Sequence, residues 1–318
     1  MTTTVSQTTA RPTRLAGYLF ALAAGAVWGT TGPLSTVLYR AGEQITGIGY
    51  WRLVVGFAGL VVFGLFRRDL FRVEPKAWLL VAFGGGSLTA LFEVAYQFGI
   101  AGTGVASAAA LLYIAPVLVA VLAHPILGEK LTALRIALAI VVMIGAALTV
   151  QGGSHGAGTA AIPLPSLVAG VAGGLLAMVA YAGMTLVARY AVPRYGAIQV
   201  LFLEMAGAIF VLGIVLPLAG YPLVRPHGAS AWTYVVLLAL GPVLAANFLF
   251  FAALKRIDAA PTAVAATVEP VVGTLLALFL LGQHLTPIGV LGLTMVVGGV
   301  AGGYVKEATE TAEAPVRR

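Results

Sequence analysis

The sequence contains no cysteine, and few of its 318 residues are charged. Without thiols the chain can form no disulfide, and it offers neither a cysteine nucleophile nor a thiolate metal site. Charged residues make up 9% of the chain, whereas soluble proteins average about 25%. Hydrophobic residues make up 60%. Water cannot be the main solvent of such a chain, so we predict an integral membrane protein that contacts the lipid bilayer.

Motifs for several other chemistries are also missing. The sequence has no G-x-x-x-x-G-K-[ST] phosphate loop and no H-E-x-x-H motif, and its four histidines are scattered. The formal charge of +7 is spread over short loops and forms no basic surface with interleaved aromatics, as nucleic-acid binding would require. We therefore expect no catalytic residues, no metal, no cofactor and no nucleic acid.

Long apolar runs fill most of the chain. In hydrocarbon the backbone must satisfy its own polar groups, so only helices or closed barrels span a membrane. Barrel strands alternate in hydropathy, whereas the run 164–191 does not. Each spanning helix needs about 20 apolar residues, and we predict an all-α membrane protein of ten transmembrane helices. Their expected ranges are 15–39, 46–66, 77–99, 104–122, 131–151, 164–189, 196–219, 231–253, 261–280 and 285–305.

The first apolar run follows Arg11 and Arg14, as a signal peptide would. The apolar core of a signal peptide is at most about 15 residues long, and this run is longer, so we expect a retained helix. A Gly-rich stretch divides the ten helices five and five. The expected division is an N-terminal tail at 1–14, a first repeat at 15–151, a linker at 152–163, a second repeat at 164–305 and a disordered tail at 306–318.

The basic residues predict one orientation. With the N-terminus placed in the cytoplasm, 15 of the 18 Lys and Arg residues fall on the cytoplasmic side and two on the other side, while Arg52 lies within a span. Cytoplasmic loops of membrane proteins carry this excess of positive charge. We predict a multi-pass protein of the cell's inner (plasma) membrane, with both termini cytoplasmic and the linker extracytoplasmic.

The two halves resemble each other at a shift of 154 residues. Residues 116–132 (PVLVAVLAHPILGEKLT) align with 270–286 (PVVGTLLALFLLGQHLT) with eight identities in 17 positions, including both prolines. Since each repeat holds an odd number of helices, the second copy must enter the membrane from the opposite side. Inverted repeats are typical of secondary transporters, which bind substrate near mid-membrane between the repeats. The pattern therefore predicts transport by alternating access.

Several motifs resemble one family. The segment ASAAALLYIAPV (106–117) followed by LGEKLT (127–132), together with WGTTG (28–32) and Trp51-Arg52, is similar to the EamA family of the drug/metabolite transporter superfamily. The resemblance covers about residues 15–305. It implies ten helices, cytoplasmic termini, no ATPase domain and often export of amino acids or other metabolites. The second half departs from the pattern, because Gln283 and His284 stand where the first half has Glu129 and Lys130. That departure argues against a shared role for Glu129.

Ionisable residues inside spans are candidate functional residues, because each costs at least about 2.5–3.5 kcal/mol at a helix centre. Glu269 precedes Pro270, whose missing N–H frees a backbone carbonyl, so the carboxylate could hold an amine or a coupled proton. Arg52 and Glu93 could form a pair that either serves function or only fixes packing. Glu204 could instead reach toward the inner interface. The candidates are Arg52, Glu93, Glu204 and Glu269, with Gln97 and Asn247 as polar companions.

Three aromatic residues lie near the middle of predicted spans. Trp28, Tyr113 and Tyr181 are away from the interfaces that Trp and Tyr prefer, so they either line a cavity or pack between helices. A shift of 154 residues places Asn247 on Glu93 and Glu269 on Ala115, so the polar layout is only partly duplicated. We expect a substrate site formed by Trp28, Tyr113, Tyr181, Glu269, Asn247 and Gln97, with Arg52, Glu93 and Glu204 as a charge pair or coupling residues.

The leading hypothesis is an exporter of small amphipathic metabolites, with amino acids favoured by the resemblance. Drugs and other cationic metabolites are alternative substrates. A membrane enzyme would need a convergent nucleophile, base or metal set, which the sequence does not offer, and a non-transporting receptor or assembly subunit would need no repeat. Small residues along 292–303 predict a tight helix face, either within the chain or between two copies, so a monomer and a homodimer both fit.

Overall fold

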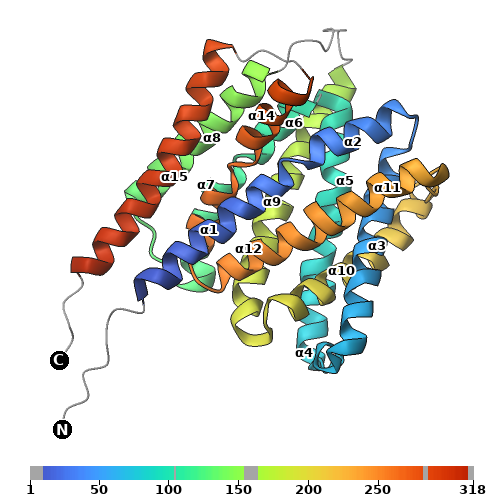
Figure 1. Ribbon diagram of the computed structural model, residues 1–318, viewed down its shortest axis with the longest axis horizontal. Helices are drawn as coiled ribbons and strands as arrows, with labels where there is room; N and C mark the ends of the chain where they lie inside the picture. The colour runs from blue at the N-terminus through green and yellow to red at the C-terminus, as the bar shows by residue number, and fades with distance from the viewer. Residues whose placement is uncertain (1–9, 104, 154–163, 282–285, 314–318) are drawn as a thin grey trace.

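The computed structural model of the protein describes residues 10–103, 105–153, 164–281 and 286–313 (Figure 1). Over these residues it contains helices and turns and no strand. The helices are α1 (Ala10–Trp28), α2 (Thr31–Arg40), α3 (Ile45–Phe66), η2 (Arg68–Phe71), α4 (Pro75–Ala77), η3 (Trp78–Gly85), α5 (Gly86–Thr103), α6 (Val105–Leu112), α7 (Ala115–Leu127), α8 (Ala133–Gly153), α9 (Leu164–Tyr195), α10 (Ala197–Leu218), α11 (Gly228–Leu238), η4 (Ala239–Ala246), α12 (Asn247–Leu254), α13 (Ala259–Ala266), α14 (Glu269–Leu281) and α15 (Pro287–Glu313).

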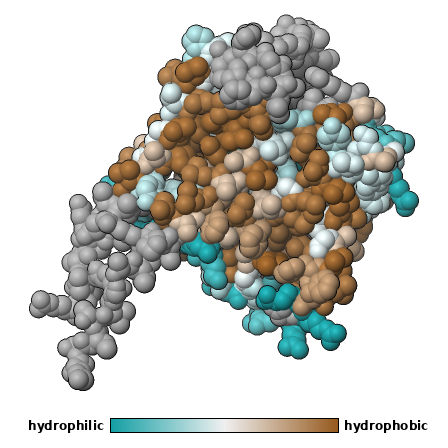
Figure 2. Space-filling view, viewed as in Figure 1, coloured by the Kyte–Doolittle hydropathy of each residue, from teal (hydrophilic) through white to brown (hydrophobic). Residues whose placement is uncertain are grey.

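The outer surface is apolar over a broad band. Figure 2 shows hydrophobic side chains across the middle of one face, with polar residues gathered toward its edges. Large side chains such as Phe66 and Leu218 are 82% and 83% exposed, which would be unfavourable in water and is expected in lipid. Within the described residues, eight helical stretches are long and apolar enough to cross a membrane: Arg14–Ser35, Thr46–Phe66, Pro75–Tyr96, Ala108–Leu127, Leu167–Tyr195, Ala197–Leu218, Gly228–Leu254 and Pro287–Lys306.

The ten expected ranges all contain helix, but two of them fall outside these eight stretches. The apolar part of α8, Ala133–Thr149, is shorter, and the range 261–280 is divided between α13 and α14. The prediction of a disordered tail from residue 306 is wrong as far as Glu313, because α15 continues to that residue. The apolar pattern ends near Lys306, but the Ala and Glu residues that follow favour helix without it.

Two helix interruptions occupy equivalent places in the two halves. The chain leaves the helix at Tyr113 and Ile114, and again at Thr267 and Val268, 154 residues later. Each interruption comes just before a proline, Pro116 or Pro270, whose ring would clash with the carbonyl four residues earlier and which has no N–H to donate. The repeated proline therefore produces the same broken helix in both halves.

The backbone hydrogen bonds show how each interruption is made. The N–H of Ile114 donates to Leu111 O and that of Val268 to Ala265 O, both at 3.3 Å. This three-residue spacing tightens the last turn before the break. α7 and α14 then begin in the same way, at the residue before the proline.

Glycines set the closest helix contacts. α8 and α15 lie side by side in Figure 1, and they run antiparallel, since Gly292 contacts Gly145 whereas Gly299 contacts Val142. A Cβ built on Gly292 would lie 2.4 Å from the backbone nitrogen of Thr149 and 2.5 Å from Gly145 O. The tight face expected along 292–303 thus packs within the chain at this point.

We predict that Gly292→Ala lowers the free energy of unfolding by about 1–3 kcal/mol, because the added methyl group would force backbones apart. Gly298→Ala is the matched control on the same helix, since no atom lies within 4 Å of its built Cβ. Thermal unfolding of both variants in detergent, followed by circular dichroism, measures the difference. Equal melting temperatures for the two variants would contradict this account of the α8–α15 contact.

Candidate functional site

The two broken helices bring Tyr113 and Glu269 to the middle of the molecule. Tyr113 lies in the first interruption and is buried, and Glu269 is the first residue of α14 after the second. The charge of Glu269 acts on the phenols of both Tyr113 and Tyr181. One residue from each broken helix and one from α9 therefore share the same surroundings, and their role in binding substrate stays a prediction.

α1 packs directly against the second interruption. A Cβ on Gly25 would lie 2.2 Å from Ala266 O, and one on Gly29 would lie 2.8 Å from Glu269 O. Only glycine permits this approach, because any side chain would displace the backbone of the broken helix. Gly25 and Gly29 thus hold Trp28, which lies between them in the sequence, close to the start of α14.

The carboxylate of Glu269 has no hydrogen bond or ion pair to any residue that the structure describes, and Glu269 is half-buried. Neither of its oxygens is among the fully enclosed polar atoms that lack a partner, so part of the carboxylate surface is exposed. An unpaired carboxylate at membrane depth is costly. Its surroundings are suited to a cationic ligand or a proton.

Tyr181, whose phenol lies near the Glu269 charge, belongs to a group of aromatic rings drawn from several helices. The Trp28 ring lies 6.5 Å from that of Tyr181 and 5.2 Å from that of Phe250, and the last two rings are 6.3 Å apart. The Phe92 ring extends the group, 6.2 Å from Tyr181 and stacked at 5.7 Å on Tyr96. Tyr96 of α5 and Phe250 of α12 correspond at the 154-residue shift. The aromatic group is therefore drawn from corresponding helices of the two halves.

Trp28 and Asn247 meet at one backbone carbonyl. The indole Nε1 of Trp28 donates to Pro242 O at 3.0 Å, and Nδ2 of Asn247 donates to Pro242 O at 3.3 Å and to Val243 O at 2.8 Å. Pro242 lies in η4, a π-helical stretch whose wide turns leave carbonyls available. The Asn247 amide group thus stabilises its own helix, and a contact with substrate stays a prediction for this residue. The Gln97 side chain lies outside the described residues.

The expected Arg52–Glu93 ion pair is present. Nη2 of Arg52 lies 2.5 Å from Oε1 and 2.7 Å from Oε2 of Glu93, and the two side chains are 15% and 13% exposed. The pair joins α3 to α5, both in the first half. Charge-assisted bonds of this length strongly fix the two helices relative to each other.

Glu204 is buried in α10 and bound to a different partner. Its Oε1 accepts a hydrogen bond from the Thr89 hydroxyl at 2.7 Å. Thr89 and Glu93 are one turn apart on α5 and so lie on the same face of that helix. The carboxylates of Glu93 and of Glu204, which accepts from Thr89, are therefore both found along this face. The structure thus groups Arg52, Glu93 and Glu204 around α5, whereas Glu269 faces the aromatic group. The alternative that the Glu204 side chain reaches toward the inner interface is wrong, because the residue is 6% exposed.

A second group of charges was missed by the sequence reasoning. Glu129, Arg135, Arg189 and Asp258, called the charge cluster below, are joined by ion pairs of 2.9–3.0 Å. Glu129 was not expected to have a shared role, because the second half has Gln283 in its place. A usable signal was present, since all four residues fall in predicted loops or at predicted helix ends on the cytoplasmic side.

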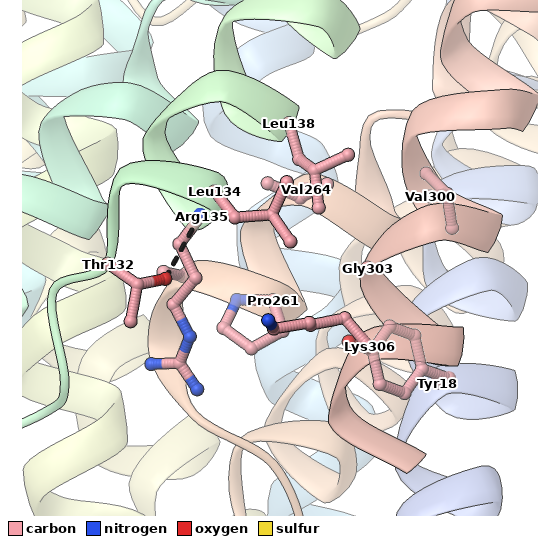
Figure 3. Close-up of a pocket in the computed structure, with 11 residues that line it drawn as sticks. Tyr18, Thr132, Leu134, Arg135, Leu138, Pro261, Val264, Val300, Gly303 and Lys306 are labelled. Atoms are coloured by element: carbon pink, nitrogen blue, oxygen red, sulfur yellow. Dashed lines mark hydrogen bonds between the residues drawn. The ribbon is translucent and has the colours of Figure 1, made fainter. Parts of the chain in front are cut away.

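Beside the charge cluster lies a small, open hollow between α1, α8, α13 and α15 (Figure 3). Leu138, Val264 and Val300 form its apolar wall, and Arg135 and Lys306 line its rim. In Figure 3 the Arg135 and Lys306 side chains approach the same opening. The hollow lies at the end of the bundle where α1 begins and α15 ends, called the terminal end below.

An apolar belt, two repeats and a broken helix in each repeat define a multi-pass membrane protein of the transporter class. The chain belongs to the EamA-like transporter family, whose model matches residues 15–151 and again residues 168–304. It is 27% identical over 288 residues to the "Uncharacterized transporter YwfM" of Bacillus subtilis (strain 168), covering 89% of this chain and 91% of that one. A protein of known crystal structure shares the fold, with a TM-score of 0.73 at 20% identity over 91% of this chain and 96% of the other.

We predict that Glu93→Gln lowers the free energy of unfolding by about 3–5 kcal/mol, because it leaves the Arg52 charge without its carboxylate in a low-dielectric site. Adding Arg52→Met to Glu93→Gln should recover part of that loss. Arg68→Met, at an exposed arginine, is the control. Melting temperatures in detergent measure these three variants and Arg52→Met alone, and strictly additive losses for the two single substitutions would show that the ion pair is not coupled.

Proposed function

We propose that the protein is a ten-helix alternating-access transporter, built from two inverted halves, that exports small amphipathic metabolites with an amino group. Amino acids are the first substrates to test. The antiparallel packing of α8 and α15, the last helices of the two halves, supports the inverted arrangement. The equivalent breaks in α6–α7 and α13–α14 support a site between the halves, since broken helices form the binding sites of many transporters.

The observation that carries the proposal is the Glu269 carboxylate, which has no partner in the described structure and faces aromatic rings. A carboxylate attracts an ammonium group, and aromatic faces attract cations as well as apolar surface. A substrate with a protonated amine and an apolar body would fill both requirements. When no substrate is bound, a proton on Glu269 would neutralise the site, which is the basis for proposed coupling to a proton gradient.

A second substrate class is favoured by the state of Arg52. An amino acid also carries a carboxylate, and its natural partner would be an arginine, but Arg52 is bound to Glu93 through both carboxylate oxygens. Cationic compounds without a carboxylate need only Glu269 and the aromatic group. The second candidate function is therefore export of cationic amphiphiles, drugs included.

We place both termini in the cytoplasm and the protein in the inner (plasma) membrane. The start of α1 and the end of α15 lie at the same end of the molecule in Figure 1, which agrees with an even number of crossings. The charge asymmetry of the loops supports the direction.

We predict that Glu269→Gln lowers the initial rate of transport at least tenfold. The measurement is uptake of radiolabelled compounds into proteoliposomes, over a panel of amino acids and aromatic monoamines, with and without a pH gradient. Glu204→Gln is the matched control, because an amide oxygen can still accept the Thr89 hydrogen bond, and it should stay within threefold of the parent.

The panel separates the candidate functions. Saturable uptake of amino acids supports the first substrate class, and uptake of monoamines alone supports the second. No saturable uptake of any compound by folded protein would overturn both. A rate for Glu269→Gln equal to that of the parent at every pH would remove Glu269 from the mechanism.

A further inference from the structure

The charge cluster joins the two halves of the chain at the terminal end. Arg189 Nε lies 3.0 Å from Glu129 Oε1, and Arg189 Nη2 lies 2.9 Å from Asp258 Oδ1. Arg135 Nη2 lies 2.9 Å from Asp258 Oδ2. Glu129 and Arg135 belong to the first repeat, and Arg189 and Asp258 to the second. The four charges alternate in sign along this chain of contacts, so they balance one another.

Glu129 also binds the start of α13. The backbone N–H of Ala259 donates to both of its oxygens, at 2.9 and 3.0 Å. The first N–H groups of a helix have no partner within the helix and lie at its positive end, so a carboxylate is favourable there. Arg189 donates in addition to Leu254 O, at the end of α12. The cluster thus holds both sides of the connection between α12 and α13.

α13 links the charge cluster to the candidate site. It has eight residues, which is about 12 Å at 1.5 Å per residue, and the interruption before Glu269 follows it directly. Ala263, in the middle of α13, is 1% exposed and belongs to the same buried core as Ala123 of α7 and Ala188 of α9. Any opening of the terminal end between α13 and these helices would have to break the cluster.

We propose that the charge cluster holds the terminal end of the transport path closed, and that this end opens when Glu129 releases Arg189 and the N–H of Ala259. The inference rests on the proposed transport function, to which it adds the residues that control access at one end. Glu129 is the central member because its carboxylate is the one that binds both the arginine and the helix start.

Protonation of Glu129 would weaken both contacts. Burial raises the pKa of Glu129 above its ordinary 4.5, and the nearby charge of Asp258 raises it further, while the Ala259 N–H and Arg189 act in the opposite direction. The other ionisable groups around it are Arg135, Lys130, whose carbonyl binds Arg135, and His124, whose ring binds the Glu129 carbonyl. Because the pKa is raised, Glu129 gains its proton at a pH above 4.5, so the terminal end should open more readily as pH falls.

The cysteine-free chain allows a direct test of access. Ala263→Cys introduces a single thiol at a site that the closed end buries, and a membrane-impermeant maleimide then reports opening in lipid nanodiscs. We expect Arg189→Ala to raise the labelling rate at least fivefold. Arg194→Ala is the control on the same helix, because Arg194 stacks on Tyr190 at 3.6 Å and bonds to its carbonyl, and it should change the rate less than twofold.

The pH dependence gives a second, independent measurement. The parent with the Ala263→Cys reporter should label faster as pH is lowered from neutral toward the raised pKa of Glu129, after correction for the reactivity of a free thiol. Glu129→Gln should label fast and show no such pH dependence. If Arg189→Ala fails to stay monodisperse, Arg135→Ala leaves the Glu129–Arg189 contact in place and should give a smaller rise.

Labelling requires no substrate, so the two proposals can fail separately. Labelling that rises as expected in a protein that transports nothing would support the closing role and overturn the proposed function. Rates within twofold of the parent for Arg189→Ala, Arg135→Ala and Glu129→Gln would overturn the closing role, whatever the transport assay gives.

Discussion

A proline within a membrane-spanning segment leaves a carbonyl of the preceding turn without its donor, and lipid offers no water to replace it. Much of the centre of this protein depends on how that constraint is met twice, at Pro116 and Pro270. In the second half α1 comes close enough, through Gly25 and Gly29, to cover the freed backbone. The carboxylate of Glu269 and the indole of Trp28 lie where they do because of this close approach.

The carboxylates at membrane depth differ chiefly in their partners. Glu93 has an arginine and Glu204 a hydroxyl group, so both can be explained by the packing of α3, α5 and α10. Glu269 has neither among the described residues and sits beside aromatic rings. The contrast separates carboxylates that hold helices together from one that is available to a ligand.

Periodicity and composition were sufficient to locate the helices, since every expected range contains helix, and the repeated proline was visible as Pro116 and Pro270. The Arg52–Glu93 pair followed from their similar depth in adjacent spans. The hydrogen bond from the Asn247 side chain to the backbone of its own helix could not be foreseen, because it depends on the π-helical stretch η4. The charge cluster was not predicted from the sequence, for a different reason. Glu129 contacts Arg189 and Ala259, which are 60 and 130 residues away in the sequence, and only the packed helices bring them together.

The glycine contacts also decide which parts of the molecule can move as one. α1 belongs to the first repeat by sequence, yet Gly25 and Gly29 fasten it to α13 and α14 of the second. In the same way Gly173 and Gly174 of α9 fasten that helix to α5 of the first repeat, with a built Cβ on Gly173 only 2.7 Å from Ala95 O. These close contacts therefore join the two repeats to each other. Each glycine pair belongs to one repeat and packs on helices of the other, so neither repeat could bury these helix faces without the other.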